Sequence, residues 1–158
     1  MVVELIKLTE KNIPVIYHIQ QSAFLPLLKK YQDYDTNPAM ETEEIILHKL
    51  RRSGTTAYGF LVDGSIVGSV RIHECEDQSC RVSALCVLPE YQSRGIAQEA
   101  MQKLESRYPD TKCWRLDTIL QETGNCHLYE KLGYIQTGQR ETAYDGMTLV
   151  DYEKHILR

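Results

Sequence analysis

The chain has 158 residues, which suits one domain, and we expect residues 1–158 to fold as a single unit. Its apolar share of 42% and charged share of 25% are typical of a globular protein, and its net charge of −4 argues against nucleic acid as a partner. No apolar run approaches the roughly 18 residues of a membrane span, and Glu4 and Lys7 interrupt the apolar N-terminus, so we expect no membrane partner and no secretory signal.

Cysteine usage indicates a reducing, cytoplasmic location. The five cysteines are an odd number and show no paired CxxC spacing. His73, Cys75 and Cys80 could be imagined as metal ligands, but no second Cys or His pair follows at zinc-site spacing. Free cysteines mostly behave as small apolar residues, so we expect no metal.

The N-terminal part predicts a strand followed by a helix. Val2–Leu8 is expected to be a strand, with its apolar positions interrupted by charges. Thr9 can cap the helix that follows, whose apolar residues recur at helical spacing between Ile13 and Phe24. Pro26 should kink or divide this helix, because proline removes a backbone donor.

A second helix and three strands are expected next. Asn37 followed by Pro38 is typical of a helix start and predicts a helix to about Arg52. Asp63-Gly64 is a strong hairpin signal between two β-rich runs. The expected strands are Thr55–Val62, Ser65–Glu74 and Arg81–Leu88.

The hydrophobic period changes after Gly95. Apolar residues between Ala97 and Tyr108 line one face of a helix, and Pro109 ends it. The remaining elements are expected to be a strand at Lys112–Ile119, a helix at about Glu122–Leu132 with Gly133 as its C-terminal cap, and strands at Tyr134–Gly138 and Met147–His155.

The element order β-α-α-β-β-β-α-β-α-β-β predicts an α+β (mixed α/β) domain. We expect a central mixed, mostly antiparallel sheet of about seven strands, flanked by about four helices. The opening hairpins should be antiparallel, and the later β-α-β crossover should place two strands parallel.

The stretch Leu85–Ala97 carries the chemistry, because a strand runs into a turn that opens directly into an amphipathic helix. A helix N-terminus has unpaired N–H groups and a positive dipole end, which favour phosphate. Gly95 and Ala97 keep the backbone accessible, and Arg94 adds a cation. The stretch lacks both the dinucleotide fingerprint and the Walker loop, so a different phosphate ligand is indicated.

Two segments resemble the signatures of the GNAT superfamily of N-acetyltransferases. Gln92-Ser93-Arg94-Gly95-Ile96-Ala97 is similar to the Q/R-x-x-G-x-G/A pyrophosphate loop, and the stretch from Asn125 to Tyr134 resembles an Asn-started helix ending in Y-x-K-L-G-[FY]. The resemblance implies a GNAT-like domain with acetyl-CoA as cosubstrate. The alternative for these segments is an ordinary strand–turn–helix followed by a capped helix.

The resemblance also implies roles for individual residues. Asn125 and Tyr129 lie four apart on one helical face, where both can point at the cofactor, and Tyr129 would protonate or hydrogen-bond the departing thiolate. The backbone N–H of Val87 would polarise the thioester carbonyl. A core aromatic with a satisfied hydroxyl is the alternative for Tyr129. The backbone groups implied to hold CoA are those of Leu85, Cys86, Val87, Gln92, Ser93, Arg94, Gly95, Ile96 and Ala97.

The general base is open at this point. Many members of the family carry a carboxylate on the strand before the loop, but Arg81–Leu88 contains neither Asp nor Glu. Glu74 and Glu76, acting through a water molecule, are candidates at the end of the preceding strand, and His73 is another. A base drawn from solvent is the remaining alternative.

By resemblance, two loops border the acceptor pocket. The first contains Tyr31, Asp33, Tyr34 and Asp35, and the second contains Tyr144 and Asp145. An acidic, aromatic rim of this kind could hold a cationic amine. Glu41, Glu43 and Glu44 have an equally good alternative, which is to complement the positive end of a helix.

Two functions follow from these observations. The first is an acetyl-CoA-dependent N-acetyltransferase that moves an acetyl group to a primary amine of a small molecule or peptide by direct attack, as a monomer or homodimer. The second is a non-catalytic acyl-CoA-binding sensor or interaction module. An enzyme needs Tyr129 together with a usable base, whereas a binding module needs neither, and the presence of Tyr129 favours the enzyme.

Overall fold

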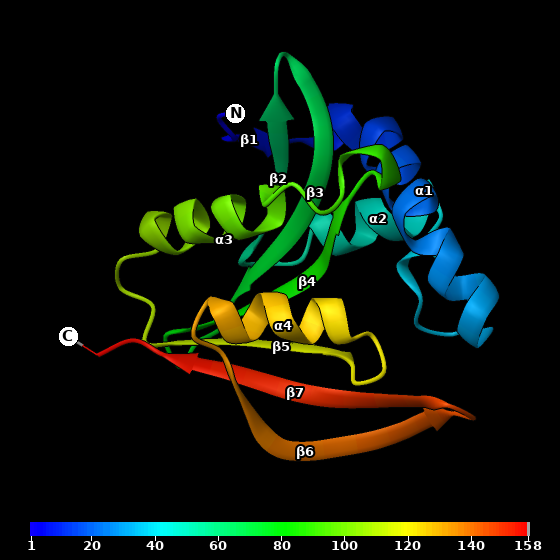
Figure 1. Cartoon of the computed structure of the whole chain (residues 1–158). Helices are drawn as coiled ribbons and strands as arrows, with labels where there is room; N and C mark the ends of the chain where they lie inside the picture. The colour runs from blue at the N-terminus through cyan, green and yellow to red at the C-terminus, as the bar shows by residue number, and fades with distance from the viewer. Residues whose placement is uncertain (158) are drawn as a thin grey trace.

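The computed structural model describes residues 1–157, in which seven strands and four α-helices follow one another in the expected order (Figure 1). The helices are α1 (Ile13–Tyr31), α2 (Glu43–Leu50), α3 (Ile96–Arg107) and α4 (Thr123–Lys131). The strands are β1 (Glu4–Leu8), β2 (Thr55–Val62), β3 (Ser65–Glu74), β4 (Ser79–Val87), β5 (Cys113–Ile119), β6 (Ile135–Tyr144) and β7 (Met147–His155). Within the described part of the chain, no helix combines the length and apolar character that crossing a bilayer requires.

All seven strands form one sheet in the order β1-β2-β3-β4-β5-β7-β6, and every neighbouring pair except β4 and β5 is antiparallel. The expected mixed, mostly antiparallel sheet is therefore confirmed. The parallel pairing of β4 with β5 is short, running from Ser79 opposite Cys113 to Arg81 opposite Arg115. Beyond Arg81, β4 continues to Val87 with no partner on β5, so the two strands separate.

The helices cover both faces of the sheet. On one face, α3 and α4 pack over a core that includes Phe60, Leu104, Trp114 and Tyr152. On the other face, α1 and α2 contribute to a second cluster of buried residues, Leu8, Ile13, Ile16, Ile46 and Ala57. Trp114 and Leu116 belong to the first core, so the alternation of side chains along β5 turns Cys113 and Arg115 towards the opposite face.

The β2–β3 hairpin agrees with the sequence expectation. Asp63 and Gly64 both have positive φ angles, of 49° and 82°, as a two-residue turn of the type I′ class requires. Gly133 has a φ of 96° where α4 ends, so its expected role as a C-terminal cap is confirmed.

The structure corrects two helix expectations. Pro26 does not divide α1, which continues through the proline with buried residues on both sides of it, at Gln20 and Leu28, so tertiary packing maintains the helix. The expected helix from Asn37 to Arg52 is divided instead. Asn37 caps a short 3₁₀ helix, η2 (Pro38–Met40), and the extended residue Glu41 separates η2 from α2.

Glu41 leaves the helical path to enter a buried ionic network. Its carboxylate accepts two hydrogen bonds from the Arg71 guanidinium, at 2.9 and 3.1 Å, and one each from Lys49 Nζ, at 2.5 Å, and Gln20 Nε2, at 3.0 Å. Burial alone raises the pKa of Glu41, but Arg71 and Lys49 outweigh burial and hold that pKa at about 2. The network therefore joins α1 and α2 to β3, and complementing a helix dipole is not the role of Glu41.

Glu41→Ala should lower the free energy of unfolding by about 3–5 kcal/mol, because it leaves the Arg71 side chain, 11% exposed, without its carboxylate. Glu43→Ala, at an exposed position in the first turn of α2, is the matched control and should cost about 1 kcal/mol or less. Urea unfolding of both variants measures the difference. Equal losses in the two variants would contradict a structural role for the network.

The same contact predicts a dependence of stability on pH. The pKa of Glu41 is lower in the folded state than its ordinary value of 4.5, so its contribution is present above that value and is lost as the pH falls towards 2. The urea midpoint of the wild-type protein should fall over this interval. In Glu41→Ala this part of the acid sensitivity should be absent.

Candidate active site

A cleft of about 730 Å³ lies where β4 leaves β5. Its walls are the end of β4, the turn into α3, the length of α4 and part of α1. Leu85, Cys86 and Val87 line it from β4, and Asn125 and Tyr129 line it from α4. The structure thus brings together the two segments whose sequences carry the family resemblance.

The turn before α3 presents free backbone N–H groups to this cleft. Gly95 is the N-cap residue of α3, has a φ of 78° and makes no side-chain cap. A Cβ atom at Gly95 would meet no atom within 4 Å, so the space in front of the helix is open. Among described residues, nothing accepts a hydrogen bond from the N–H groups of Ile96, Ala97 or Gln98. Open space, free donors and a helix N-terminus together fit a pyrophosphate.

The end of β4 turns backbone groups towards the same space. Leu88 N–H donates to the Val67 carbonyl of β3 at 2.8 Å, so the neighbouring residue Val87 directs its N–H and C=O away from β3. The Val87 carbonyl instead accepts from Gln92 Nε2 at 3.0 Å. On β4, a bulge with Ala84 at a φ of 52° precedes this stretch and shifts the register against β3. The Val87 N–H therefore faces the gap left by β5.

Tyr129 presents its hydroxyl to the cleft. Its ring is buried and packs against Tyr134 and Tyr152, with centroids 5.9 and 6.1 Å away. Within residues 1–157 the Tyr129 hydroxyl has no hydrogen-bond partner. Every fully buried side-chain oxygen of these residues does have a partner, so the Tyr129 hydroxyl is not fully buried and is open to the cleft. Burial raises the pKa of Tyr129, and the charge of Asp117 adds to the effect. The phenol is therefore protonated at neutral pH.

Glu122 is a cleft residue that the sequence reasoning missed. Among the described residues that line the cleft, it supplies the only carboxylate, which accepts hydrogen bonds from Tyr31 Oη at 2.5 Å and Lys30 Nζ at 2.7 Å. Burial raises the pKa of Glu122, but Lys30 and Tyr31 outweigh burial and lower it. Its spacing of three residues from Asn125 and seven from Tyr129 was the available signal, since such residues share a helical face.

Comparison with known proteins settles the family. The sequence profile of the Acetyltransferase (GNAT) family matches residues 13–134. The chain belongs to the GNAT acetyltransferase family. No match was found among curated proteins. Membership implies acetyl-CoA-dependent acetylation, and the expected mixed fold of this family is the fold observed.

Solved GNAT structures share the fold at low sequence identity. A ribosomal-protein alanine N-acetyltransferase from Escherichia coli is 16% identical with a TM-score of 0.81, covering 99% of this chain and 96% of its own. The PaiA N-acetyltransferase from Thermoplasma acidophilum, in complex with coenzyme A, is 15% identical with a TM-score of 0.79, covering 99% and 100%. The spermidine/spermine N-acetyltransferase SpeG from Vibrio cholerae is 14% identical with a TM-score of 0.74, covering 97% and 93%.

In this GNAT domain, the base expected from sequence does not reach the cleft. Glu74 pairs with Cys80 near the start of β4, whereas the cleft is lined by the other end of that strand. Glu76 lies in the β3–β4 turn, and the His73 ring is hydrogen-bonded to Thr55 Oγ1 at 2.9 Å. The antiparallel pairing of β3 with β4 places the end of β3 opposite the beginning of β4, so these residues are at the wrong end of the sheet.

The expected acidic rim is also different in the structure. Asp33 is 2% exposed, and its carboxylate accepts hydrogen bonds from the backbone N–H groups of Asp35, at 3.1 Å, and Thr36, at 2.9 Å. Asp33 therefore stabilises its own loop and does not face an incoming ligand. Tyr34 is exposed, and the Tyr144 hydroxyl donates to Asp35, which joins the β6–β7 turn to the loop after α1.

Arg94 takes a position outside the cleft lining. Its guanidinium lies over the Tyr91 ring, 5.3 Å from the centroid, and Arg94 is exposed. A pyrophosphate at the α3 N-terminus would therefore be held first by backbone N–H groups, with the Arg94 cation at the periphery.

Gly95→Glu should abolish acetyl-CoA binding, because the new carboxylate would occupy the open space in front of the α3 N-terminus. Gly64→Glu is the matched control. Gly64 also has a positive φ, of 82°, with no atom near its Cβ position, but it lies in the β2–β3 turn. Calorimetric titration should show unchanged affinity in Gly64→Glu. Unchanged affinity in a folded Gly95→Glu protein would rule the loop out as the site.

Proposed function

We propose that this GNAT chain is an N-acetyltransferase that transfers the acetyl group of acetyl-CoA to a primary amine of a small molecule or peptide. The observation that carries the proposal is the unpartnered Tyr129 hydroxyl, which faces the same cleft as the free N–H groups of the α3 N-terminus. A protein that only binds acyl-CoA needs the free N–H groups but has no use for the Tyr129 hydroxyl.

The backbone supplies the binding contacts for the cofactor. When bound, acetyl-CoA supplies a thioester whose acyl carbon accepts an amine and whose thiolate is a good leaving group. The N–H groups of Ile96, Ala97 and Gln98 would donate to the pyrophosphate, and Asn125 borders the same cleft from α4. The N–H of Val87, turned away from β3, would donate to the thioester carbonyl oxygen, where negative charge develops.

Tyr129 would act as the general acid. Its hydroxyl stays protonated because burial raises its pKa, so it is available to hydrogen-bond and protonate the departing thiolate. A free thiol has a pKa of about 8.5, so the thiolate needs only modest help to leave. The packing of Tyr134 and Tyr152 against the Tyr129 ring holds the donor in one orientation.

The thiol of Cys86 is unsuited to covalent catalysis. Cys86 is the cysteine on the β4 wall of the cleft, and burial raises its pKa to about 12. A thiol with that pKa remains protonated at neutral pH and is a poor nucleophile. This supports direct attack of the amine on the thioester.

Glu122 would hold the acceptor amine. Its lowered pKa keeps the carboxylate ionised, and Glu122 lines the cleft from the N-terminal end of α4. Lys30 and Tyr31 both donate to Oε2, so Oε1 is the oxygen that would accept from an amine. An alkylammonium has a pKa of about 10.4 and must lose a proton before it attacks, so Glu122 would bind the cation and water would take the proton. The similar structures include N-acetyltransferases named for an alanine of ribosomal protein S18 and for spermidine and spermine, and the polyamines carry primary amines.

The proposed location is the cytoplasm. All five cysteines are free thiols, as a reducing compartment maintains them. A monomer or homodimer would suffice, since the described residues of one chain line the cleft from four elements.

Tyr129→Phe should lower kcat by about 10²–10⁴-fold and leave acetyl-CoA affinity unchanged, because it removes a proton donor and keeps the ring. Tyr108→Phe is the control, since the Tyr108 hydroxyl pairs with that of Tyr58 at 2.8 Å and borders no part of the cleft. Thiol release with a panel of polyamines and peptides measures turnover. A fully active Tyr129→Phe protein would reject Tyr129 as the acid. If none of the amines in the panel gives thiol release with the wild-type protein, the non-catalytic binding module is favoured.

Glu122→Gln should raise the KM of a cationic amine by about tenfold or more and leave acetyl-CoA affinity unchanged, because the amide can still accept from Tyr31 but carries no charge. Glu90→Gln removes an equal charge from an exposed position in the turn before α3 and is the control. Initial-rate kinetics of the three proteins give the comparison. Equal acceptor KM values would show that Glu122 does not bind the amine.

A further inference from the structure

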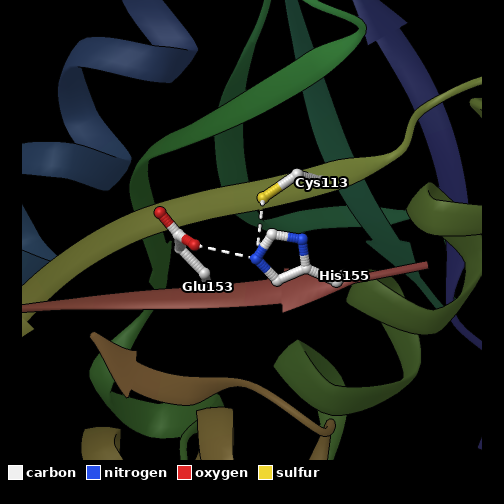
Figure 2. A group of neighbouring side chains, drawn as sticks. All are labelled: Cys113, Glu153 and His155. Atoms are coloured by element: carbon white, nitrogen blue, oxygen red, sulfur yellow. Dashed lines mark hydrogen bonds and ion pairs between the residues drawn. The ribbon is translucent and has the colours of Figure 1, made fainter. Parts of the chain in front are cut away.

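Three side chains with metal-binding atoms meet at the end of the sheet remote from the cleft, and Figure 2 shows them turned towards one another. Cys113 begins β5, and its cross-strand partner is His155 at the end of β7. Glu153 lies two residues before His155 and therefore projects from the same face of β7. The antiparallel pairing of β5 with β7 thus brings Cys113 together with two residues that lie far from it in the sequence.

The distances within this group suit a tetrahedral ion. Cys113 Sγ lies 3.9 Å from His155 Nε2, which lies 2.9 Å from Glu153 Oε2, and all three atoms are within 4.8 Å of one another. Bonds of about 2.3 Å from zinc to sulfur and about 2.0–2.1 Å to nitrogen and oxygen place tetrahedral ligands roughly 3.3–3.6 Å apart. The pairs Cys113–His155 and His155–Glu153 lie within about 0.5 Å of this spacing, and the Cys113–Glu153 pair, at most 4.8 Å apart, would have to close by up to about 1.2 Å to complete three corners of a tetrahedron.

The surroundings leave the required atoms available. The Arg115 guanidinium donates to the other oxygen of Glu153, Oε1, at 3.3 Å, and to Asp77 at 3.0 Å. Asp77 therefore compensates the charge of Arg115, and Glu153 Oε2 faces His155. Cys113 is 6% exposed while the His155 side chain is 66% exposed, so an ion would rest on a buried sulfur with one side open to water.

We propose that Cys113, Glu153 and His155 form a site for Zn²⁺, with water as the fourth ligand. A thiolate, an imidazole and a carboxylate are the ligand types that zinc takes, whereas Mg²⁺ and Ca²⁺ prefer oxygen ligands alone. Cys113 releases its thiol proton to solvent when the zinc–sulfur bond forms. The ion joins the start of β5 to the end of β7, so it acts on the stability of the sheet and takes no part in acyl transfer.

The site is tested with the full chain, free of any affinity tag and of chelator. Isothermal titration with ZnCl₂ should show one ion per chain, and CoCl₂ should give the absorption of tetrahedral cobalt with a thiolate ligand. His155→Ala, at an exposed position, should weaken Zn²⁺ binding by more than the roughly 10–100-fold that loss of an outer-shell partner costs. Zn²⁺ should raise the thermal midpoint of the wild-type protein and not that of His155→Ala.

Cys113→Ser and Cys75→Ser complete the test. Cys75 is an exposed free thiol on the β3–β4 connection, so Cys75→Ser controls for adventitious binding and should keep both the affinity and the cobalt spectrum. Cys113→Ser should lose the thiolate band. The proposal is overturned if wild-type protein binds no Zn²⁺ at micromolar concentrations, if His155→Ala binds it equally well, or if the cobalt spectrum disappears with Cys75 rather than with Cys113.

Discussion

The early separation of β4 from β5 is the constraint on which the site depends. A parallel pair normally satisfies its backbone groups along the whole overlap, but here the ladder ends at Arg81 and Arg115. The cleft volume, the direction of the Val87 N–H and the room for α3 and α4 to approach from one face all follow from that gap. The bulge at Ala84 belongs to the same feature, because it turns the last residues of β4 into the opening.

Polar groups of the fold divide into those that are satisfied within the chain and those that are free. The Asp33 carboxylate and the Glu41 network are fully engaged within the fold, and they stabilise the loop after α1 and the attachment of α2. The Tyr129 hydroxyl and the α3 N-terminus have no partners in the described chain. Unsatisfied groups are costly in a folded protein unless a ligand or water completes them, so their concentration in one cleft supports the proposal that a ligand binds there.

Local signals predicted most of the fold, since strand and helix periods, the Asp63-Gly64 turn and the Gly95 turn depend on neighbouring residues. Long-range contacts account for what was missed. Glu41 leaves the helix because its carboxylate pairs with Arg71 on β3, which is distant in sequence. Glu74 misses the cleft because antiparallel pairing places it beside the start of β4, at the opposite end of that strand. The grouping of Cys113 with His155 likewise depends on strand register, which spacing along the chain does not reveal.

The outward-facing main chain of Val87 has a consequence for how such a site varies. Backbone donors are common to all residues except proline, so the side chain at this position could change without loss of the proposed hydrogen bond to the thioester. If the proposal holds, alanine scanning would register little at Val87. Two solved structures share this fold at 16% and 15% identity to the chain, so the path of the backbone is retained while most side chains differ. A contact made by the main chain depends on that path and tolerates such divergence.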